Sequence, residues 1–335
     1  MDTATEKSPH ELQETFACLN EPRIYDDAEC ARLAQTIHRI RELKTERDAV
    51  IMAHNYQRPE IFEVADFIGD SLELARQATT VSADVIVFCG VHFMAETAKI
   101  LNAGKTVLLP DMRAGCSLAD SVTADELVER RDALRKLYPD LQVVAYVNTT
   151  AEVKAVVDVC CTSANAVKVV NALPCEHVLF VPDEHLGQYV QRETTKTVIS
   201  WNGNCYVHHQ ITPESIRAVK EALPHVRVLV HPECRADVIA LADAVLSTSG
   251  MVSYAKQSDA QEFLVVTECG LSDRLLIEVP EKKFYKACKL CQFMKMITLE
   301  GTQHALERME HEIVLPEEVR AGAERSLRRM LELSH

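Results

Sequence analysis

The sequence lacks any long apolar segment. No stretch approaches the roughly 18 consecutive apolar residues that a membrane-spanning helix needs. The N-terminal segment from Met1 to Glu6 has no apolar core of the kind found in secretory signal peptides, and no low-complexity linker is visible. We therefore expect a cytoplasmic protein that does not span a membrane.

The sequence is also short of positive charge. Its 36 lysines and arginines stand against 50 aspartates and glutamates, which gives a net charge of −14. A nucleic-acid-binding surface needs clustered Lys and Arg to neutralise phosphates, so this balance argues against nucleic acid as a partner. If the ligands are anions, local dipoles or a metal must bind them.

Cysteine, by contrast, is abundant, with twelve residues in 335. Disulfides are rare in a reducing cytoplasm, so we do not expect a disulfide framework. Some cysteines are instead expected to bind a metal, and others to fill small apolar spaces in the core.

A threefold repetition runs through the chain. Three apolar, strand-like runs end in polar segments, and three positions after these runs keep equal spacings of two and seventeen residues in every copy. The aligned residues, copy by copy, are His54, Tyr56 and Ser71, then Tyr146, Asn148 and Ser163, then His231, Glu233 and Thr248. Three equal spacings are hard to attribute to chance.

Each copy also carries a cysteine after its fourth apolar run. These are Cys116, Cys205 and Cys291, which lie 89 and 86 residues apart. A Thr-x-Asp/Glu segment follows each cysteine and predicts a helix N-terminus with a threonine cap. The three caps are Thr123, Thr212 and Thr298.

Short apolar runs that alternate with helical patterns are typical of βαβ units and parallel sheets. The predicted fold class is α/β, with three α/β/α sandwich domains related by pseudo-three-fold symmetry, each with a four-stranded parallel sheet. We expect repeats at residues 49–139, 140–224 and 225–300. An N-terminal extension and helix at 1–48 and a helical tail at 301–335 would pack onto them.

Ligands of parallel sheets bind beyond the carboxyl ends of the strands. The nine aligned polar residues follow the first and second strands, so they should line one central cavity if the domains face one another. Hydroxyls beside helix N-termini would suit a substrate with several carboxylates or a phosphate. The alternative for these serines and threonines is simple helix capping.

The three aligned cysteines would converge at the other end of that cavity. A lone cysteine is more often a small buried apolar residue than a ligand, but recurrence in all three copies favours metal ligation. Thiolates select iron–sulfur clusters, zinc or Cu(I). Electron-transfer [4Fe-4S] clusters commonly have four cysteines, so three would leave one iron open as a Lewis acid.

Seven motifs together resemble the quinolinate synthase family, from about residue 48 to residue 306. They are Ala53–Gln57, Gly69–Ser71, Tyr146–Asn148, Thr162–Ala166, His231–Cys234, Ser247–Thr248 and Cys291–Met294. The resemblance implies three α/β/α domains around a central [4Fe-4S] cluster. It also implies condensation of iminoaspartate with dihydroxyacetone phosphate to quinolinate, phosphate and water, in de novo NAD synthesis. Direct transfer of iminoaspartate from an aspartate oxidase stays open.

The resemblance also implies roles for the aligned residues. The implied cluster ligands are Cys116, Cys205 and Cys291. The implied catalytic residues are Glu233, as an acid or base, with Tyr56 and His231. The implied substrate-binding residues are His54, Ser71, Tyr146, Asn148, Ser163 and Thr248.

One departure from the family concerns the last ligand. Some members end in Cys-x-x-Cys-x-x-Cys, whereas here Tyr285 takes the first position and leaves only Cys288 and Cys291. Cys288 has no counterpart in the other copies, so we do not expect it to be a ligand. We expect it to fill space or, after cluster loss, to form a disulfide with Cys291.

Two other functions remain open at this point. One is a non-catalytic iron–sulfur or zinc sensor, although a sensor has no need for nine polar residues around an open metal position. Colour distinguishes a brown cluster from colourless zinc. The other is an iron–sulfur dehydratase of another small acid, which only a substrate test separates from a quinolinate synthase.

Overall fold

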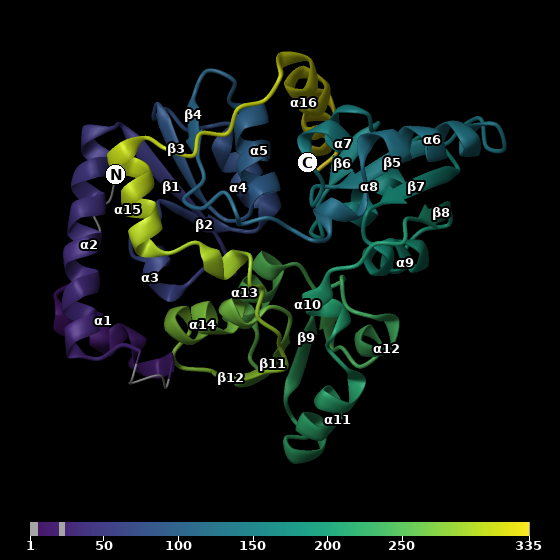
Figure 1. Ribbon diagram of the computed structural model, residues 1–335. Coiled ribbons are helices and arrows are strands. Elements are labelled where there is room, and N and C mark those ends of the chain that lie inside the picture. The colour runs from purple at the N-terminus through teal and green to yellow at the C-terminus, as the bar shows by residue number, and fades with distance from the viewer. Residues whose placement is uncertain (1–5, 20–23, 335) are drawn as a thin grey trace.

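The computed structural model describes residues 6–19 and 24–334. Within them the chain forms three four-stranded sheets (Figure 1), and the strands of each sheet pair in parallel. The strand orders are β2-β1-β3-β4, β6-β5-β7-β8 and β10-β9-β11-β12, which is the same order three times. The predicted α/β class and its three four-stranded parallel sheets are thereby confirmed.

We call each sheet with its flanking helices a unit. The strands of unit one are β1 (Ala49–His54), β2 (Phe67–Gly69), β3 (Val85–Cys89) and β4 (Thr106–Leu108). Those of unit two are β5 (Gln142–Tyr146), β6 (Val159–Cys161), β7 (His177–Val181) and β8 (Thr197–Ser200). Those of unit three are β9 (Arg227–Val230), β10 (Ala244–Val245), β11 (Glu262–Val266) and β12 (Lys283–Lys286).

Helices connect the strands and cover both faces of each sheet. Unit one has α3 (Pro59–Phe62), α4 (Ser71–Ala78) and α5 (His92–Leu101). Unit two has α6 (Ala124–Arg135), α7 (Ala151–Ala155), α8 (Ala166–Ala172) and α9 (Glu184–Arg192). Unit three has α10 (Tyr206–His209), α11 (Pro213–Ala222), α12 (Ala236–Ile239), α13 (Thr248–Gln257) and α14 (Cys269–Glu278).

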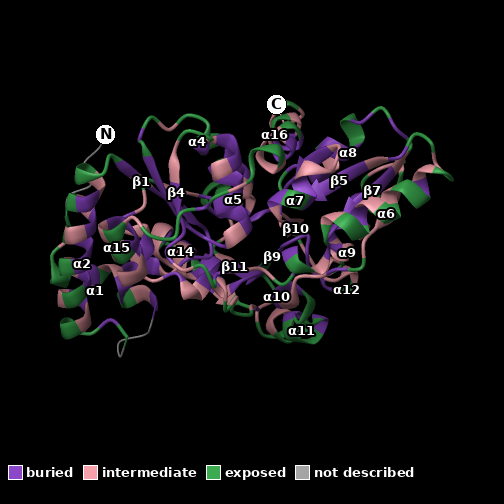
Figure 2. Cartoon of the chain, turned by 45° about the horizontal axis from the view of Figure 1, so that its top comes forward, coloured by how far each residue is buried: buried purple, intermediate pink, exposed green. Residues whose placement is uncertain are grey.

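The central strands are apolar because helices cover both of their faces. All five residues of β3 are buried, and so are the last four of β7 and of β11. Figure 2 shows the buried residues concentrated in the strands and the exposed ones on the outer sides of helices such as α2 and α11. The sheets are therefore rigid supports for the loops at their carboxyl ends.

The predicted threonine caps are confirmed. Thr123, Thr212 and Thr298 are the N-cap residues of α6, α11 and α15 (Leu299–Arg308). The side chains of Thr123 and Thr298 accept bonds from helix amides, whereas Thr212 makes no such bond.

The segments outside the repeats pack onto them. Helix α2 (Asp27–Glu46) lies beside α15, as Figure 1 shows, and α1 (Pro9–Phe16) packs against α2. The last helix, α16 (Glu317–Glu332), contacts α7 and β6 of unit two and α5 of unit one. The tail thus joins two units. The domain limits at 139 and 224 stay a prediction, although the helices just before them, α6 and α11, contact α7 and α12 of the unit that follows. No helix in the described part of the chain is long and apolar enough to cross a membrane.

Candidate functional site

One cavity is lined by residues from all three units. Every site residue that the sequence predicted lies on its wall. The three thiols are those of Cys116, Cys205 and Cys291, and the nine polar residues are His54, Tyr56, Ser71, Tyr146, Asn148, Ser163, His231, Glu233 and Thr248. The equal spacings in the three repeats therefore identified the residues that line this cavity. Their chemical roles stay predictions.

The same turn follows the first strands of units one and three. His54 Nδ1 accepts the amide of Tyr56 at 3.2 Å, and His231 Nδ1 accepts the amide of Glu233 at 3.4 Å. An accepting Nδ1 leaves the proton of the neutral ring on Nε2. Burial lowers the pKa of both histidines to about 3, so both rings are neutral donors at pH 7.

Glu233 is the centre of a buried polar network. The hydroxyl of Tyr146 donates to its Oε1, and Nδ1 of His208 lies 3.1 Å from its Oε2 in a short but poorly aligned contact. Burial raises the pKa of Glu233, but His208 and the bond from Tyr146 outweigh that effect and hold the pKa to about 2. Glu233 is therefore an ionised carboxylate at neutral pH.

The network continues on the far side of His208. Its Nε2 lies 2.8 Å from the hydroxyl of Thr267, which in turn lies 2.5 Å from the hydroxyl of Tyr56. Thr267 is fully buried and follows β11 directly. Burial raises the pKa of Tyr56 and of Tyr146 well above the usual tyrosine value, so both phenols keep their protons.

Sequence reasoning missed His208 and Thr267. His208 follows Cys205 by three residues, but the corresponding positions in the other copies are Ala119 and Met294. The repeat therefore gave no signal for His208. Its one sequence clue was the short spacing from a predicted metal ligand.

The hydroxyls after the second strands occupy different places. Ser71 is the first residue of α4 and Thr248 the first residue of α13, as the helix-terminus prediction requires. Ser163 instead lies three residues before α8, so its hydroxyl does not begin a helix. Asn55 Nδ2 donates to Thr248 Oγ1 at 2.7 Å and fixes that side chain.

Asn148 offers a different signal from the cavity wall. Its Oδ1 is buried and has no hydrogen-bond partner among the described residues. Buried polar atoms are rarely left unpaired. A ligand group in the cavity would satisfy this one.

Free thiolates are disfavoured at this site. Burial raises the pKa of Cys116 to about 12, and it also raises the pKa of Cys205 and of Cys291. Three such thiols in one cavity need a cation to stabilise their ionised form, and this donor set fits a soft metal centre. Cys205, His208 and Glu233 also bring ligand atoms within 4.8 Å of one another, which would suit a single ion.

The expectation that Cys288 fills space or pairs with Cys291 was wrong, whereas nothing contradicts the expectation that it is not a ligand. Cys288 forms a disulfide with Cys269, the first residue of α14, with their Cα atoms 5.1 Å apart. Strands β11 and β12 are paired, so the segments that follow them lie side by side although 19 residues separate the two cysteines. Cys288 therefore neither merely fills space nor pairs with Cys291.

Three parallel α/β units around a cavity with three thiols and an ionised carboxylate define a candidate thiolate metal centre in a repeated α/β protein. The profile of the family described as Quinolinate synthetase A protein matches residues 38–332. The chain belongs to this quinolinate synthase family, which is a family of enzymes.

Individual relatives cover nearly the whole chain. The chain is 53% identical over 299 residues to a quinolinate synthase of Dehalococcoides mccartyi, covering 89% of this chain and 98% of the relative. It is 52% identical over 302 residues to one of Thermodesulfovibrio yellowstonii, with 89% and 98% covered. For quinolinate synthase 1 of Methanosarcina acetivorans, the identity is 50% over 300 residues, with 89% and 97% covered.

Proposed function

We propose that this chain condenses iminoaspartate with dihydroxyacetone phosphate to quinolinate, phosphate and water, in de novo NAD synthesis in the cytoplasm. Family membership supports quinolinate as the product. The observation that carries the proposal is the convergence of three thiols and nine polar groups from three units on one cavity.

The three cysteines of the cavity would hold a [4Fe-4S] cluster. Three thiols of raised pKa in one cavity support this donor set. With three protein ligands, one iron would stay open and supply a Lewis acid for the substrate's oxygen atoms.

Neutral donors and helix N-termini would bind the anionic substrate groups. In His54 and His231 the backbone amide bonds Nδ1, so the Nε2–H group of each ring can donate to a substrate. The hydroxyls of Ser71 and Thr248 stand at the starts of helices, where amide dipoles favour carboxylate or phosphate. This arrangement explains how a protein with a net charge of −14 could bind anions.

The network around Glu233 would move protons. The two hydrogen bonds can point the same way: the Tyr56 hydroxyl would donate to Thr267 Oγ1, and the Thr267 hydroxyl would donate to His208 Nε2. His208 Nδ1 would then carry its proton toward Glu233, whose other oxygen accepts from Tyr146. Ring formation requires several proton removals, and His208 held by an ionised carboxylate is suited to accept them.

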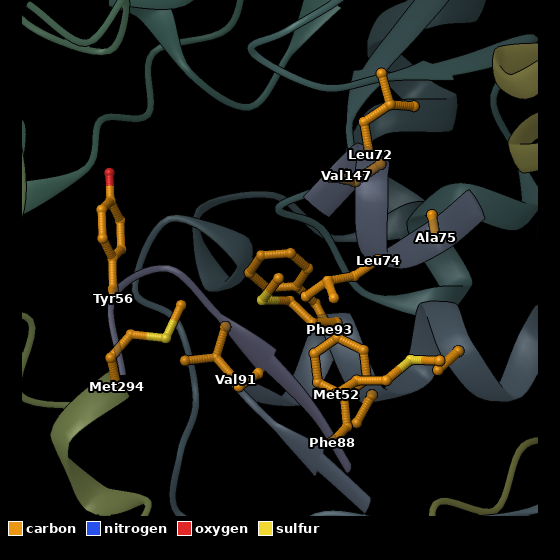
Figure 3. Packing of buried hydrophobic residues seen from close by; sticks show 14 of the residues in the cluster. Met52, Tyr56, Leu72, Leu74, Ala75, Phe88, Val91, Phe93, Val147 and Met294 are labelled. Carbon is orange, nitrogen blue, oxygen red and sulfur yellow. The ribbon is translucent and has the colours of Figure 1, made fainter. Parts of the chain in front are cut away.

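Apolar side chains would keep water away from the reaction. Val91, Phe93, Met94 and Met294 line the same cavity as the polar groups. Figure 3 shows Val91 between Met294 and Phe93, with Tyr56 beside Met294. A wall of this kind strengthens electrostatic interactions inside the site.

An anaerobic assay tests the proposal. Protein reconstituted with iron and sulfide should form quinolinate from iminoaspartate and dihydroxyacetone phosphate, and protein loaded with zinc should not. Absence of quinolinate from a brown, fully loaded protein would contradict the proposed reaction and favour a dehydratase of another acid. A colourless protein that binds one zinc would favour the sensor, with Cys205, His208 and Glu233 as its ligands.

A further inference from the structure

In all three units one backbone bond ties the loop that carries the cysteine to the helix after the third strand. The donor begins that helix, and the acceptor lies two residues before the cysteine. The bonds are His92 N to Ala114 O at 2.7 Å, Glu184 N to Gly203 O at 2.7 Å and Cys269 N to Lys289 O at 3.4 Å. The cysteine loops are thus supported in the same way.

Units two and three add a carboxylate to this support. Asp183 is the N-cap of α9; its Oδ1 accepts from Leu186 N at 2.7 Å and its Oδ2 accepts from the amide of Cys205 at 3.2 Å. Glu268 is the N-cap of α14 and repeats the pattern. Its Oε2 accepts from Gly270 N at 2.7 Å and its Oε1 accepts from the amide of Cys291 at 3.1 Å.

Unit one lacks this carboxylate. The N-cap of α5 is Val91, whose side chain has no acceptor atom, so the Cys116 loop keeps only the backbone bond. The difference shows that a helix at this place does not need an acidic cap. Helix capping alone therefore does not explain why units two and three place a buried acid at this position.

Burial makes the two acids costly. Asp183 and Glu268 are both 0% exposed, and a buried carboxylate destabilises a fold unless it is fully paired. Lys295 Nζ lies 3.5 Å from Glu268, whereas Asp183 has no ion pair among the described residues. One oxygen is enough for a helix cap, and in each acid the second oxygen bonds a cysteine amide.

We propose that Asp183 and Glu268 are positioning residues that fix the backbones of Cys205 and Cys291 so that their thiolates hold the metal centre. This rests on the proposed [4Fe-4S] cluster. Groups that orient metal ligands typically change metal affinity by about 10- to 100-fold when they are replaced. The Cys269–Cys288 disulfide joins the same two segments in unit three, so the loss of Asp183 should matter more than the loss of Glu268.

The test uses Asp183→Asn and Glu268→Gln, which keep the shape but place an amide N–H₂ against one backbone donor. Anaerobically reconstituted holoenzyme is mixed with an iron chelator, and the rate of iron loss and the electron paramagnetic resonance spectrum of the reduced cluster are recorded. We expect iron loss to be about 10- to 100-fold faster in Asp183→Asn and less accelerated in Glu268→Gln. Asp26→Asn is the control, because Asp26 caps α2 through Glu29 N, and it should lose iron at the wild-type rate.

A second variant keeps the test decisive if Asp183→Asn does not fold. Asp183→Ser retains a capping oxygen for α9 but is too short to reach the amide of Cys205 as well, and it should also lose iron faster. Wild-type iron-loss rates and an unchanged spectrum in folded Asp183 variants would overturn the inference. A wild-type protein that holds no cluster would instead overturn the proposed function itself.

Discussion

Replacing Thr267 by valine removes the hydroxyl that bridges Tyr56 and His208 and leaves only their direct contact, 3.5 Å between the Tyr56 hydroxyl and His208 Nε2. Valine has nearly the same shape, so the change deletes the oxygen and leaves the fully buried position filled. The Tyr56 hydroxyl, 2.5 Å away, and His208 Nε2, 2.8 Å away, both lose this partner. The long direct contact between the two rings then holds them less firmly in the positions that the proposed proton transfer requires.

The size of the effect follows from the bonds that are lost. A buried polar group left without its partner costs about 1–3 kcal/mol. If a similar amount is lost from the transition state, kcat/KM falls by about 10- to 100-fold. Because Thr267 does not line the cavity, the loss should appear in kcat more than in KM.

Anaerobic quinolinate assays on cluster-loaded protein measure both constants. Thr267→Ser keeps the hydroxyl and loses only a methyl group, so it is the matched control and should stay close to wild type. Wild-type kcat in Thr267→Val, with iron content unchanged, would refute the relay through Thr267.

Three further predictions concern the cavity wall. The first prediction concerns the hydroxyls that follow the second strands, tested by Ser71→Ala, Ser163→Ala and Thr248→Ala. Each change should lower kcat/KM by roughly tenfold, and unchanged kinetics would exclude that hydroxyl from substrate binding. Glu233→Gln keeps the shape and removes the charge that holds His208, so kcat should fall by about 10²-fold, and near-normal kcat would place the base elsewhere. Burial lowers the pKa of His54 to about 3, whereas in the unfolded chain the pKa is about 6.5. Below pH 6.5 the unfolded state therefore binds a proton that the folded state does not. The free energy of unfolding should fall by about 1.4 kcal/mol per pH unit as the pH drops from 6.5 toward 3. Urea unfolding of metal-free wild type and His54→Gln at pH 7 and pH 5 checks this, and equal pH dependence in both would contradict it.

The repeat explains why so much of the site could be predicted. The equal spacings after the first strands placed His54, Tyr146 and His231 at equivalent strand ends, and the structure brings all three to one cavity. The cysteines converge for the same reason, because each follows the fourth strand of its unit. When a chain repeats the same strand pattern, residues at equivalent strand ends can therefore be predicted to lie close together.

Features that break the symmetry could not be predicted in this way. His208 and Thr267 belong to one unit only, so no second copy pointed to them. The Cys269–Cys288 disulfide depends on the pairing of β11 with β12, which brings together cysteines 19 residues apart. Asp183 and Glu268 do share a register position, six residues after His177 and Glu262, but their function is visible only from the amides that they bond.

The most direct test of the account is the iron and sulfide content of protein purified without oxygen. The wild type should be brown and contain about four irons per chain. Alanine at Cys116, Cys205 or Cys291 should abolish the cluster, whereas alanine at Cys89, which is buried in β3 and does not line the cavity, should leave it intact. Full iron content after any one of the three ligand changes would contradict a cluster held by one cysteine from each unit.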